Sequence, residues 1–302
     1  MRWGNHGSYI EIHPPKEFNF EECLVFLGRS NEEVLHQIKD GLLYKLIKVN
    51  QELILCKIGF VQQVIHVEFP IVSSSKDVHE QVAAYIWEWF DLDQDLSCFY
   101  KVANQDKVLQ QVYKKYYGLR MMGIPDLFEA LTWAIMGQQI NLTFAYKLKK
   151  RFVESFGECL TFEGDTFWLY PTYERIAILE VEELRILQFT VRKAEYVIGV
   201  AKMMEAGQLT KEMLLQEQTN QQVQKSLMAV RGVGAWTADY VMMKCLHNPS
   251  AFPIADVGLQ NALKLQLGLE RKPTIEEMKE VAINWKGWQA YATFYLWRSL
   301  YA

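Results

Sequence analysis

The chain contains few cysteines, and they are scattered. The 302 residues include five of them, Cys23, Cys56, Cys98, Cys159 and Cys245. An odd, dispersed set predicts free thiols in a reducing compartment and excludes a disulfide framework. It also excludes a zinc site or iron–sulfur cluster built on clustered cysteines. The six histidines form no ligand pair at helical spacing, so we expect no metal site of these kinds.

Long apolar runs are missing as well. No segment approaches the ~18 consecutive apolar residues of a membrane-spanning helix. The amino terminus, MRWGNHGSYIEIHPP, lacks the apolar core of a signal peptide. Half of the residues are apolar and 23% are charged, which is ordinary for a soluble protein. These features predict a cytoplasmic protein with no membrane partner.

Positive charge is not in excess. The chain has 32 Lys and Arg against 36 Asp and Glu, a net charge of −4, which is weak evidence against a nucleic-acid partner. The acidity belongs to the front of the chain, because residues 1–105 carry 9 basic and 15 acidic residues. Residues 106–302 carry 23 basic and 21 acidic residues, so this part has local basic patches.

The hydrophobic pattern changes near residue 100. Before it, residues 44–49 and 53–58 form β-rich runs that predict a hairpin, residues 64–69 alternate, and helices are expected at 20–28 and 78–90. After it, helical patterns of roughly 10 to 17 residues follow one another. The predicted fold class is α+β. A small antiparallel-sheet domain (1–100) precedes an all-helical region (101–302), which we expect to form two helical subdomains with the active-site cleft between them.

The stretch VRGVGAWTA, residues 230–238, places two glycines at the start of a helix predicted from Ala235. Gly232 and Gly234 let the backbone turn tightly and approach a partner closely. No Ser, Thr, Asp or Asn caps this helix, so its free N–H groups could bind an anion such as a DNA phosphate. For two glycines alone, a plain turn between helices is the more common explanation.

Three other features have ordinary structural explanations. Asp256 follows Pro253 before a predicted helix and, taken alone, is best explained as its N-cap; its functional alternative is a carboxylate facing a developing positive charge. The basic residues between Lys147 and Arg151 are typical of a solvated helix face. The aromatic-rich stretch 285–297 predicts a final helix whose rings mostly belong to the core.

The order and spacing of these features resemble the helix–hairpin–helix (HhH-GPD) DNA glycosylases. Asp256 follows Trp236 by twenty residues, and the segments 136–140 and 191–194 and the final helix occur in the same order as in that superfamily. The resemblance covers roughly residues 120–300. Trp236 after the second glycine and the β-rich front domain resemble the 3-methyladenine DNA glycosylase II branch.

The resemblance implies a role for each matching residue. Asp256 would be the catalytic carboxylate, and the base pocket would be lined by Trp236, Tyr240 and Trp297. DNA contacts would come from Gly232, Gly234, Gln139 and Arg192. A structural Na⁺ or K⁺ would be held by the backbone carbonyls of Met228, Val230 and Val233, without any further cofactor. Gln139 stands where the best-known members carry an apolar wedge, and the adjacent Ile140 leaves the identity of the wedge open.

The function that follows is a monofunctional glycosylase that excises alkylated purines, such as 3-methyladenine and 7-methylguanine, in base excision repair. Its partner would be double-stranded DNA containing damaged bases, and the protein would be a monomer. Whether Asp256 acts on water or only through its charge stays open. One alternative is an oxidised-purine glycosylase with lyase activity, which needs a lysine where Trp236 stands. Another is a non-catalytic helix–hairpin–helix protein that only holds DNA.

Overall fold

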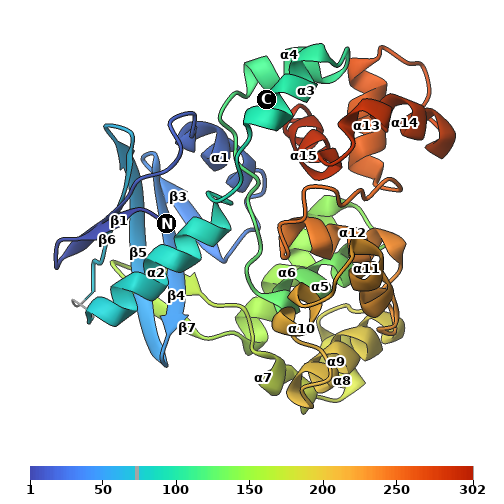
Figure 1. Cartoon of the computed structure of the whole chain (residues 1–302). Helices are drawn as coiled ribbons and strands as arrows, with labels where there is room; N and C mark the ends of the chain where they lie inside the picture. The colour runs from blue at the N-terminus through green and yellow to red at the C-terminus, as the bar shows by residue number, and fades with distance from the viewer. Residues whose placement is uncertain (72–74, 302) are drawn as a thin grey trace.

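The computed structural model describes residues 1–71 and 75–301. Its N-terminal part is a six-stranded antiparallel sheet in the order β1-β2-β6-β5-β4-β3 (Figure 1). The strands are β1 (Trp3–Asn5), β2 (Tyr9–Ile12), β3 (His36–Lys39), β4 (Leu42–Val49), β5 (Glu52–Val61) and β6 (Val64–Glu68). Helices α1 (Phe20–Leu27) and α2 (Lys76–Trp89) lie within two residues of the predicted ranges, which confirms both.

The predicted hairpin is confirmed as β4 and β5, which pair antiparallel from Leu43 with Ile58 to Val49 with Glu52. Its turn consists of Asn50 and Gln51, whose φ angles of 48° and 69° are both positive. Two successive positive φ values match the right-handed twist of the paired strands. Gln62 and Gln63 repeat this conformation between β5 and β6.

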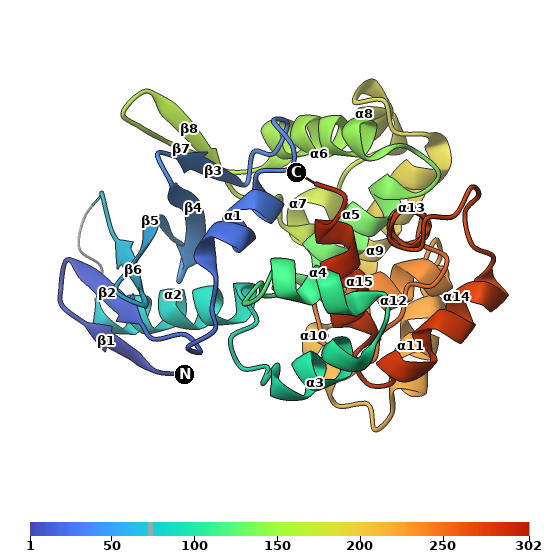
Figure 2. The same cartoon turned by 90° about the horizontal axis from the view of Figure 1, so that it is seen from above.

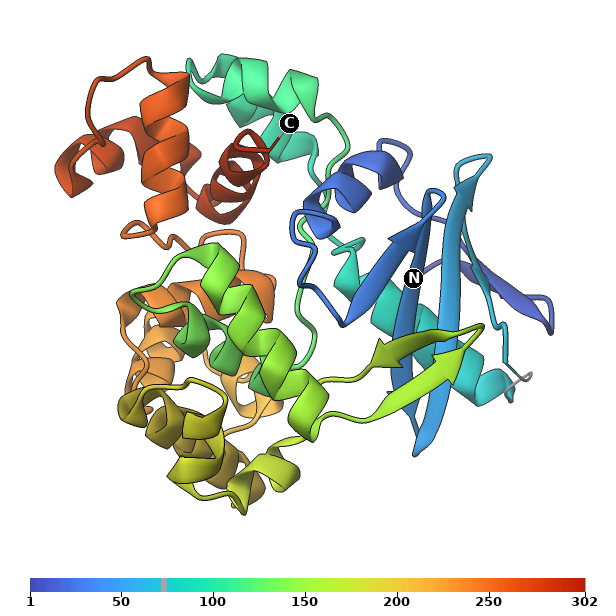
Figure 3. The same cartoon turned by 180° about the vertical axis from the view of Figure 1, so that it is seen from behind.

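The rest of the described chain is mainly helical, and its helices form two groups (Figures 1 and 3). One group contains α3 (Ser97–Gln105), α4 (Leu109–Lys115), α13 (Val257–Gln266), α14 (Ile275–Val281), the 3-10 helix η1 (Ala282–Trp285) and α15 (Gln289–Arg298). The other contains α5 (Leu127–Gly137), α6 (Leu142–Phe156), α7 (Tyr173–Ala177), α8 (Val181–Ile186), α9 (Val191–Glu205), α10 (Lys211–Leu215), α11 (Asn220–Met228) and α12 (Ala235–Lys244). The predicted domain border near residue 100 stays a prediction.

The predicted fold class, α+β, is confirmed, with one addition in the helical region. A hairpin of β7 (Cys159–Phe162) and β8 (Asp165–Trp168) leaves the helices and reaches the sheet, on the side opposite α2 (Figure 2). Phe167 is buried there against Leu46 and Leu55 of the sheet. Gln37 donates a hydrogen bond to the carbonyl of Thr166 at 2.9 Å. The hairpin therefore joins the two parts of the molecule.

Two local predictions were wrong. The final helix begins at Gln289 rather than at Trp285, because Gly287 adopts a φ of 85° that interrupts the helix. The basic stretch 147–151 is not a fully solvated face, since Lys149 is buried and pairs with Glu33 of the N-terminal domain at 2.5 Å.

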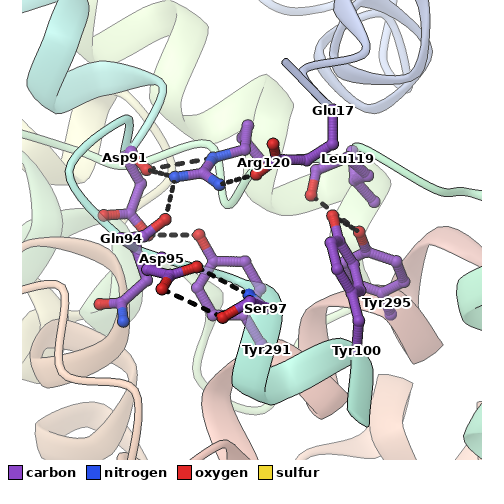
Figure 4. Close-up of polar contacts among 10 residues, drawn as sticks. All are labelled: Glu17, Asp91, Gln94, Asp95, Ser97, Tyr100, Leu119, Arg120, Tyr291 and Tyr295. Atoms are coloured by element: carbon purple, nitrogen blue, oxygen red, sulfur yellow. Dashed lines mark hydrogen bonds and ion pairs between the residues drawn. The ribbon is translucent and has the colours of Figure 1, made fainter. Parts of the chain in front are cut away.

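A buried polar network connects the end of α2 to α15 (Figure 4). The guanidinium of Arg120 donates to the carbonyls of Asp91, at 3.2 Å, and Gln94, at 2.6 Å. The hydroxyl of Tyr291 on α15 donates to the Asp91 carboxylate, and that of Tyr295 donates to the Leu119 carbonyl at 3.0 Å. These bonds satisfy polar groups that would be costly to bury unpaired, and they fix the position of α15. No helix of the described residues is long and apolar enough to cross a membrane.

Candidate active site

The glycine turn at residues 229–234 connects α11 to α12 and uses its two glycines differently. Gly232 has a φ of 93°, and a Cβ there would lie 2.3 Å from the ring of Tyr196. Only glycine fits this position. Gly234 has an ordinary extended φ of −94°, and a Cβ there would meet nothing within 4 Å. The space in front of Gly234 is therefore open to an approaching partner.

The start of α12 lacks the side-chain cap that most other helices here possess. Asp126, Asn141, Thr190 and Thr274, for example, each accept a hydrogen bond from the first turn of their helix. Gly234 cannot do this, and the N–H groups of Gly232, Gly234 and Ala235 donate to no described residue. Free N–H groups at a helix N-terminus form a site for an anion.

Gln138 holds this turn in place. Its side-chain amide donates to the Gly232 carbonyl at 2.9 Å and to the Thr237 hydroxyl at 3.0 Å. Gln138 stands directly before Gln139 in the segment 136–140 but was not among the predicted site residues. The bonds connect the end of α5 to the start of α12.

Asp256 is the N-cap of α13, as its local sequence predicts, and it has further partners. Its Oδ2 accepts hydrogen bonds from the Leu259 amide at 2.7 Å and from the Trp297 indole at 2.8 Å. Its Oδ1 accepts one from the Trp236 indole at 3.1 Å. The same carboxylate therefore caps α13 and is the candidate catalytic group. Three N–H donors face its negative charge and fix its orientation.

Gly258 makes room for this arrangement. A Cβ at this position would lie 2.8 Å from Oδ2 of Asp256 and 3.1 Å from the indole nitrogen of Trp297. Both atoms are fixed by the bonds just described, so neither can move aside cheaply. The sequence offered one signal for this residue, a glycine two positions after the candidate carboxylate.

Aromatic rings surround the carboxylate. The ring of Tyr240 lies 5.6 Å from that of Trp236 and 6.3 Å from that of Trp297, between centroids. The Trp133 indole donates to the Tyr240 hydroxyl at 2.9 Å, and the Tyr146 ring packs on Trp133. The structure thus brings together the predicted pocket residues and adds two, Trp133 and Tyr146, which as isolated aromatic residues in α5 and α6 gave no sequence signal.

The predicted DNA-contact residues lie around the same turn. Gln139 is exposed with a φ of 56°, whereas Ile140 is half-buried against the aromatic cluster. Arg192 is exposed in the first turn of α9. It lies on the same face of α9 as Tyr196, four residues later, which contacts Gly232. These placements gather the residues on one surface, and their roles stay predictions.

The carbonyls predicted to hold a cation belong to this turn as well. The Val230 carbonyl accepts the Val233 amide at 3.0 Å. Those of Met228 and Val233 accept no backbone hydrogen bond from a described residue, so they are available to a ligand. Carbonyl oxygens suit a hard cation.

Comparison with known proteins relates both parts of the chain to DNA repair enzymes. Residues 132–289 match the HhH-GPD superfamily base excision DNA repair proteins, and residues 12–131 match the N-terminal domain of 8-oxoguanine DNA glycosylase. A DNA-3-methyladenine glycosylase of Bacillus subtilis is 44% identical over the full length of both chains. DNA-3-methyladenine glycosylase 2 of Escherichia coli is 28% identical over 67% of each chain.

Solved structures share the fold. A 3-methyladenine DNA-glycosylase from Archaeoglobus fulgidus superposes with a TM-score of 0.82, at 24% identity, over 95% of this chain and 96% of that chain. An 8-oxoguanine glycosylase/lyase of Clostridium acetobutylicum, in complex with double-stranded DNA, has a TM-score of 0.77 at 16% identity, over 99% of this chain and 97% of that chain. The sequence matches decide the family: the chain belongs to the HhH-GPD superfamily of base excision DNA repair proteins, in its 3-methyladenine DNA glycosylase branch.

Proposed function

We propose that this protein is a monofunctional DNA glycosylase that excises alkylated purines, of the 3-methyladenine and 7-methylguanine type, from double-stranded DNA. The observation that carries the proposal is the carboxylate of Asp256, held by the indoles of Trp236 and Trp297 beside the ring of Tyr240. The 44% identity to a DNA-3-methyladenine glycosylase supports the substrate class.

The aromatic rings suit the damaged base. Alkylation at N3 or N7 gives a purine a positive charge, and a flipped base is read by stacking in a pocket. Electron-rich indole and phenol faces attract a cationic ring by ~0.5–2 kcal/mol per contact. Flipping costs a few kcal/mol, which these contacts offset for a damaged base more than for a normal one. Selection by charge requires no pocket shaped to one lesion.

The carboxylate suits the reaction. As the bond between C1′ and the base breaks, its electron pair stays with the base and neutralises the base's charge, so no general acid is needed. The sugar gains oxocarbenium character, which the fixed charge of Asp256 stabilises. Water then adds to C1′ and releases a proton. Oδ1 of Asp256 accepts a single hydrogen bond among the described residues, so it retains a lone pair for this water.

The surface around the glycine turn is the proposed DNA grip. The free N–H groups of Gly232 and Gly234 would bind a phosphate, with Arg192 contacting the backbone beside them. Gln139 is the better candidate for the wedge, because it is exposed at the tip of its turn while Ile140 packs inward. A Na⁺ or K⁺ on the carbonyls of Met228, Val230 and Val233 would add positive charge next to that phosphate. A monomeric enzyme, located in the cytoplasm, is part of the same proposal.

The first alternative function is a glycosylase with lyase activity, and the match of the front domain to 8-oxoguanine DNA glycosylase favours it. That match ends before the hairpin and Asp256. A lyase needs an amine nucleophile at the sugar, and Trp236 offers none. Borohydride trapping during turnover, with premade abasic DNA as the control for surface lysines, distinguishes the two: our proposal requires no covalent protein–DNA band.

The second alternative, a protein that only binds DNA, gives Asp256 no role beyond its cap. Two indole hydrogen bonds hold that carboxylate beside aromatic rings, and a protein that only binds DNA has no need of this arrangement. The direct test is to incubate the protein with methylated duplex DNA and to separate the released bases by chromatography. Free 3-methyladenine or 7-methylguanine supports the proposal, and intact bases with bound DNA would establish the binding protein.

A further inference from the structure

A small cavity lies behind Tyr240, between the helical region and the N-terminal domain. Its volume is about 60 Å³, and its aromatic walls include Trp133, Tyr146 and Tyr240. Tyr240 also packs against Trp236 and Trp297, so the cavity begins one ring away from the rings that bond Asp256. A space of this size holds a few water molecules or the edge of a base, and not a whole purine.

Cationic side chains from both parts of the molecule line this cavity, and among the described lining residues Arg29 alone carries a guanidinium. Lys149 pairs with Glu33 at 2.5 Å. Lys244 donates to the Met122 carbonyl, and the ammonium of Lys45 lies 5.6 Å from the centroid of the Trp89 ring. Arg29, which follows α1, forms no ion pair with any carboxylate of the described residues. A half-buried guanidinium without a carboxylate is costly unless a ligand or water compensates it.

The position of Arg29 is fixed by two contacts. One of its terminal nitrogens donates to the Phe26 carbonyl at 2.7 Å, and its guanidinium lies over the Phe26 ring, 3.9 Å from the centroid. It also lies 5.5 Å from the centroid of the Tyr146 ring. Arg29 and Tyr240 line the same cavity, and the charge of Arg29 opposes the rise that burial causes in the pKa of Tyr240. Most of its five N–H donors remain for other acceptors.

We propose that Arg29 is a specificity-determining residue that hydrogen-bonds the 6-oxo edge of a flipped purine. This inference rests on the proposed glycosylase function and concerns the choice among its substrates. Arginine recognises adjacent O6 and N7 acceptors with its fork of donors. A 6-amino purine instead presents N–H donors there, which a guanidinium cannot bond. Arg29 therefore favours 6-oxo bases over 3-methyladenine.

The charge of Arg29 favours the same choice of substrate. Aromatic walls select cationic bases, whereas a nearby guanidinium repels them. Hypoxanthine is neutral and has both O6 and N7 free, so it gains the most from Arg29 and little from cation–π attraction. 7-Methylguanine keeps O6 but has N7 blocked, and should depend on Arg29 to an intermediate degree.

The test compares base release by the full-length protein and its Arg29→Met and Arg29→Lys variants in single turnovers. Three duplexes of identical sequence carry hypoxanthine, 7-methylguanine or 3-methyladenine at one position. Methionine keeps the apolar contact with Phe26 but removes the charge and the donors, while lysine keeps the charge without the fork. Arg271→Met serves as the matched control, because Arg271 is exposed and pairs with Glu277.

We expect Arg29→Met to lower the rate ratio of hypoxanthine to 3-methyladenine by about tenfold or more, as loss of one charge-assisted hydrogen bond does. Lysine should restore part of this ratio, and Arg271→Met should not alter it. An equal loss on all three bases would mean that Arg29 only supports the fold, and no loss would mean that it is not in contact; either overturns the inference. Failure of the unaltered protein to release any base would instead refute the proposed function.

Discussion

Asp256 collects hydrogen bonds from three separate segments of the chain. Leu259 belongs to its own helix, Trp236 to α12 and Trp297 to α15. Since each donor is an N–H group, both oxygens of Asp256 serve as acceptors, and Oδ1 keeps room for one more donor. The chemistry of the site therefore depends on this one acidic side chain.

Asp256→Asn should abolish base release while DNA binding stays the same or becomes tighter. The variant loses the charge that stabilises the transition state, a loss of ~2.7–4 kcal/mol, and also loses the repulsion of the phosphates. Single-turnover rates and binding to abasic DNA measure the two effects. A variant with more than about a tenth of the original rate would contradict the assignment.

Gly258→Ala should lower the rate of base release strongly and lower Tm only slightly. The added methyl group would meet Oδ2 of Asp256 and the Trp297 indole, and the site must shift to relieve the contact. The control is Gly268→Ser, at a glycine that has a positive φ and open space around it. Activity and Tm should be measured for both variants. Full activity in Gly258→Ala would show that the indole bonds are dispensable.

Among the elements, the turn before α12 contrasts with the helix starts that carry a side-chain cap. A glycine in place of a polar cap costs only about a few tenths of a kcal/mol of helix stability, and no described residue replaces the missing hydrogen bond. Free N–H groups beside open space are the arrangement that a phosphate requires. The two glycines should therefore respond differently to substitution.

Gly232→Ala should lower Tm, because its φ is positive and Tyr196 fills the space for a side chain. Gly234→Ala should lower the free energy of unfolding by only about 0.5–1 kcal/mol, the cost of alanine at an N-cap, but weaken DNA binding several-fold, since its methyl group occupies the open approach. Thermal unfolding and fluorescence anisotropy with duplex DNA test the pair. Unchanged DNA affinity in Gly234→Ala would place the phosphate elsewhere.

Helix α9 provides a second test of the grip. Binding to undamaged duplex should weaken steeply with salt and show little sequence preference. Arg192→Ala should reduce the slope of log K against log salt by about 1, the share of one phosphate contact. The exposed Arg185→Ala, on the neighbouring α8, is the control. An unchanged slope for Arg192→Ala would remove Arg192 from the interface.

At the scale of the whole molecule, the contacts that join the helical region to the sheet domain include a hairpin and a buried ion pair. The β7–β8 hairpin covers one side of the sheet, and the ion pair of Lys149 and Glu33 spans the interface near the aromatic pocket. The ammonium group of Lys149 also lies 5.0 Å from the ring centroid of Trp133, which bonds Tyr240. The packing of the two parts therefore helps to position the aromatic rings of the pocket.

Glu129 makes the stability of this interface depend on pH. Burial, opposed in part by Lys45 and Lys149, raises the pKa of Glu129 to about 7. The folded protein thus binds more protons than the unfolded chain between about pH 4.5 and 7, and this contribution to stability falls as pH rises through that window. Glu129→Gln, which mimics the protonated form, should exceed the original protein in stability at pH 8 by up to ~3 kcal/mol. The gain should shrink toward pH 5.

Urea unfolding at pH 5, 6, 7 and 8 measures this difference. The variant Glu276→Gln, at an exposed acid on α14, is the control and should show no such trend. A Glu129→Gln variant that is equally destabilised at every pH would show that the carboxylate is ionised and paired in the folded protein.

The sequence by itself determined the features that depend on neighbouring residues. Caps, turns and the alternation of apolar residues encode the α+β class, the β4–β5 hairpin and the start of α12, because each reflects interactions within a few positions. The spacing of Trp236 and Asp256 further indicated the family. The resemblance to that family then named Asp256, Trp236, Tyr240 and Trp297 as candidates.

Only the tertiary structure decided how these residues meet. The bond from Trp297 to Asp256 joins positions 41 apart, and that from Trp133 to Tyr240 joins positions 107 apart. Such contacts depend on how whole helices pack, and no local pattern distinguishes Trp133 from any other core aromatic. The same holds for Arg29, which reaches the pocket cavity from another domain, and for Gly258, which is needed because the distant Trp297 meets Asp256 beside it.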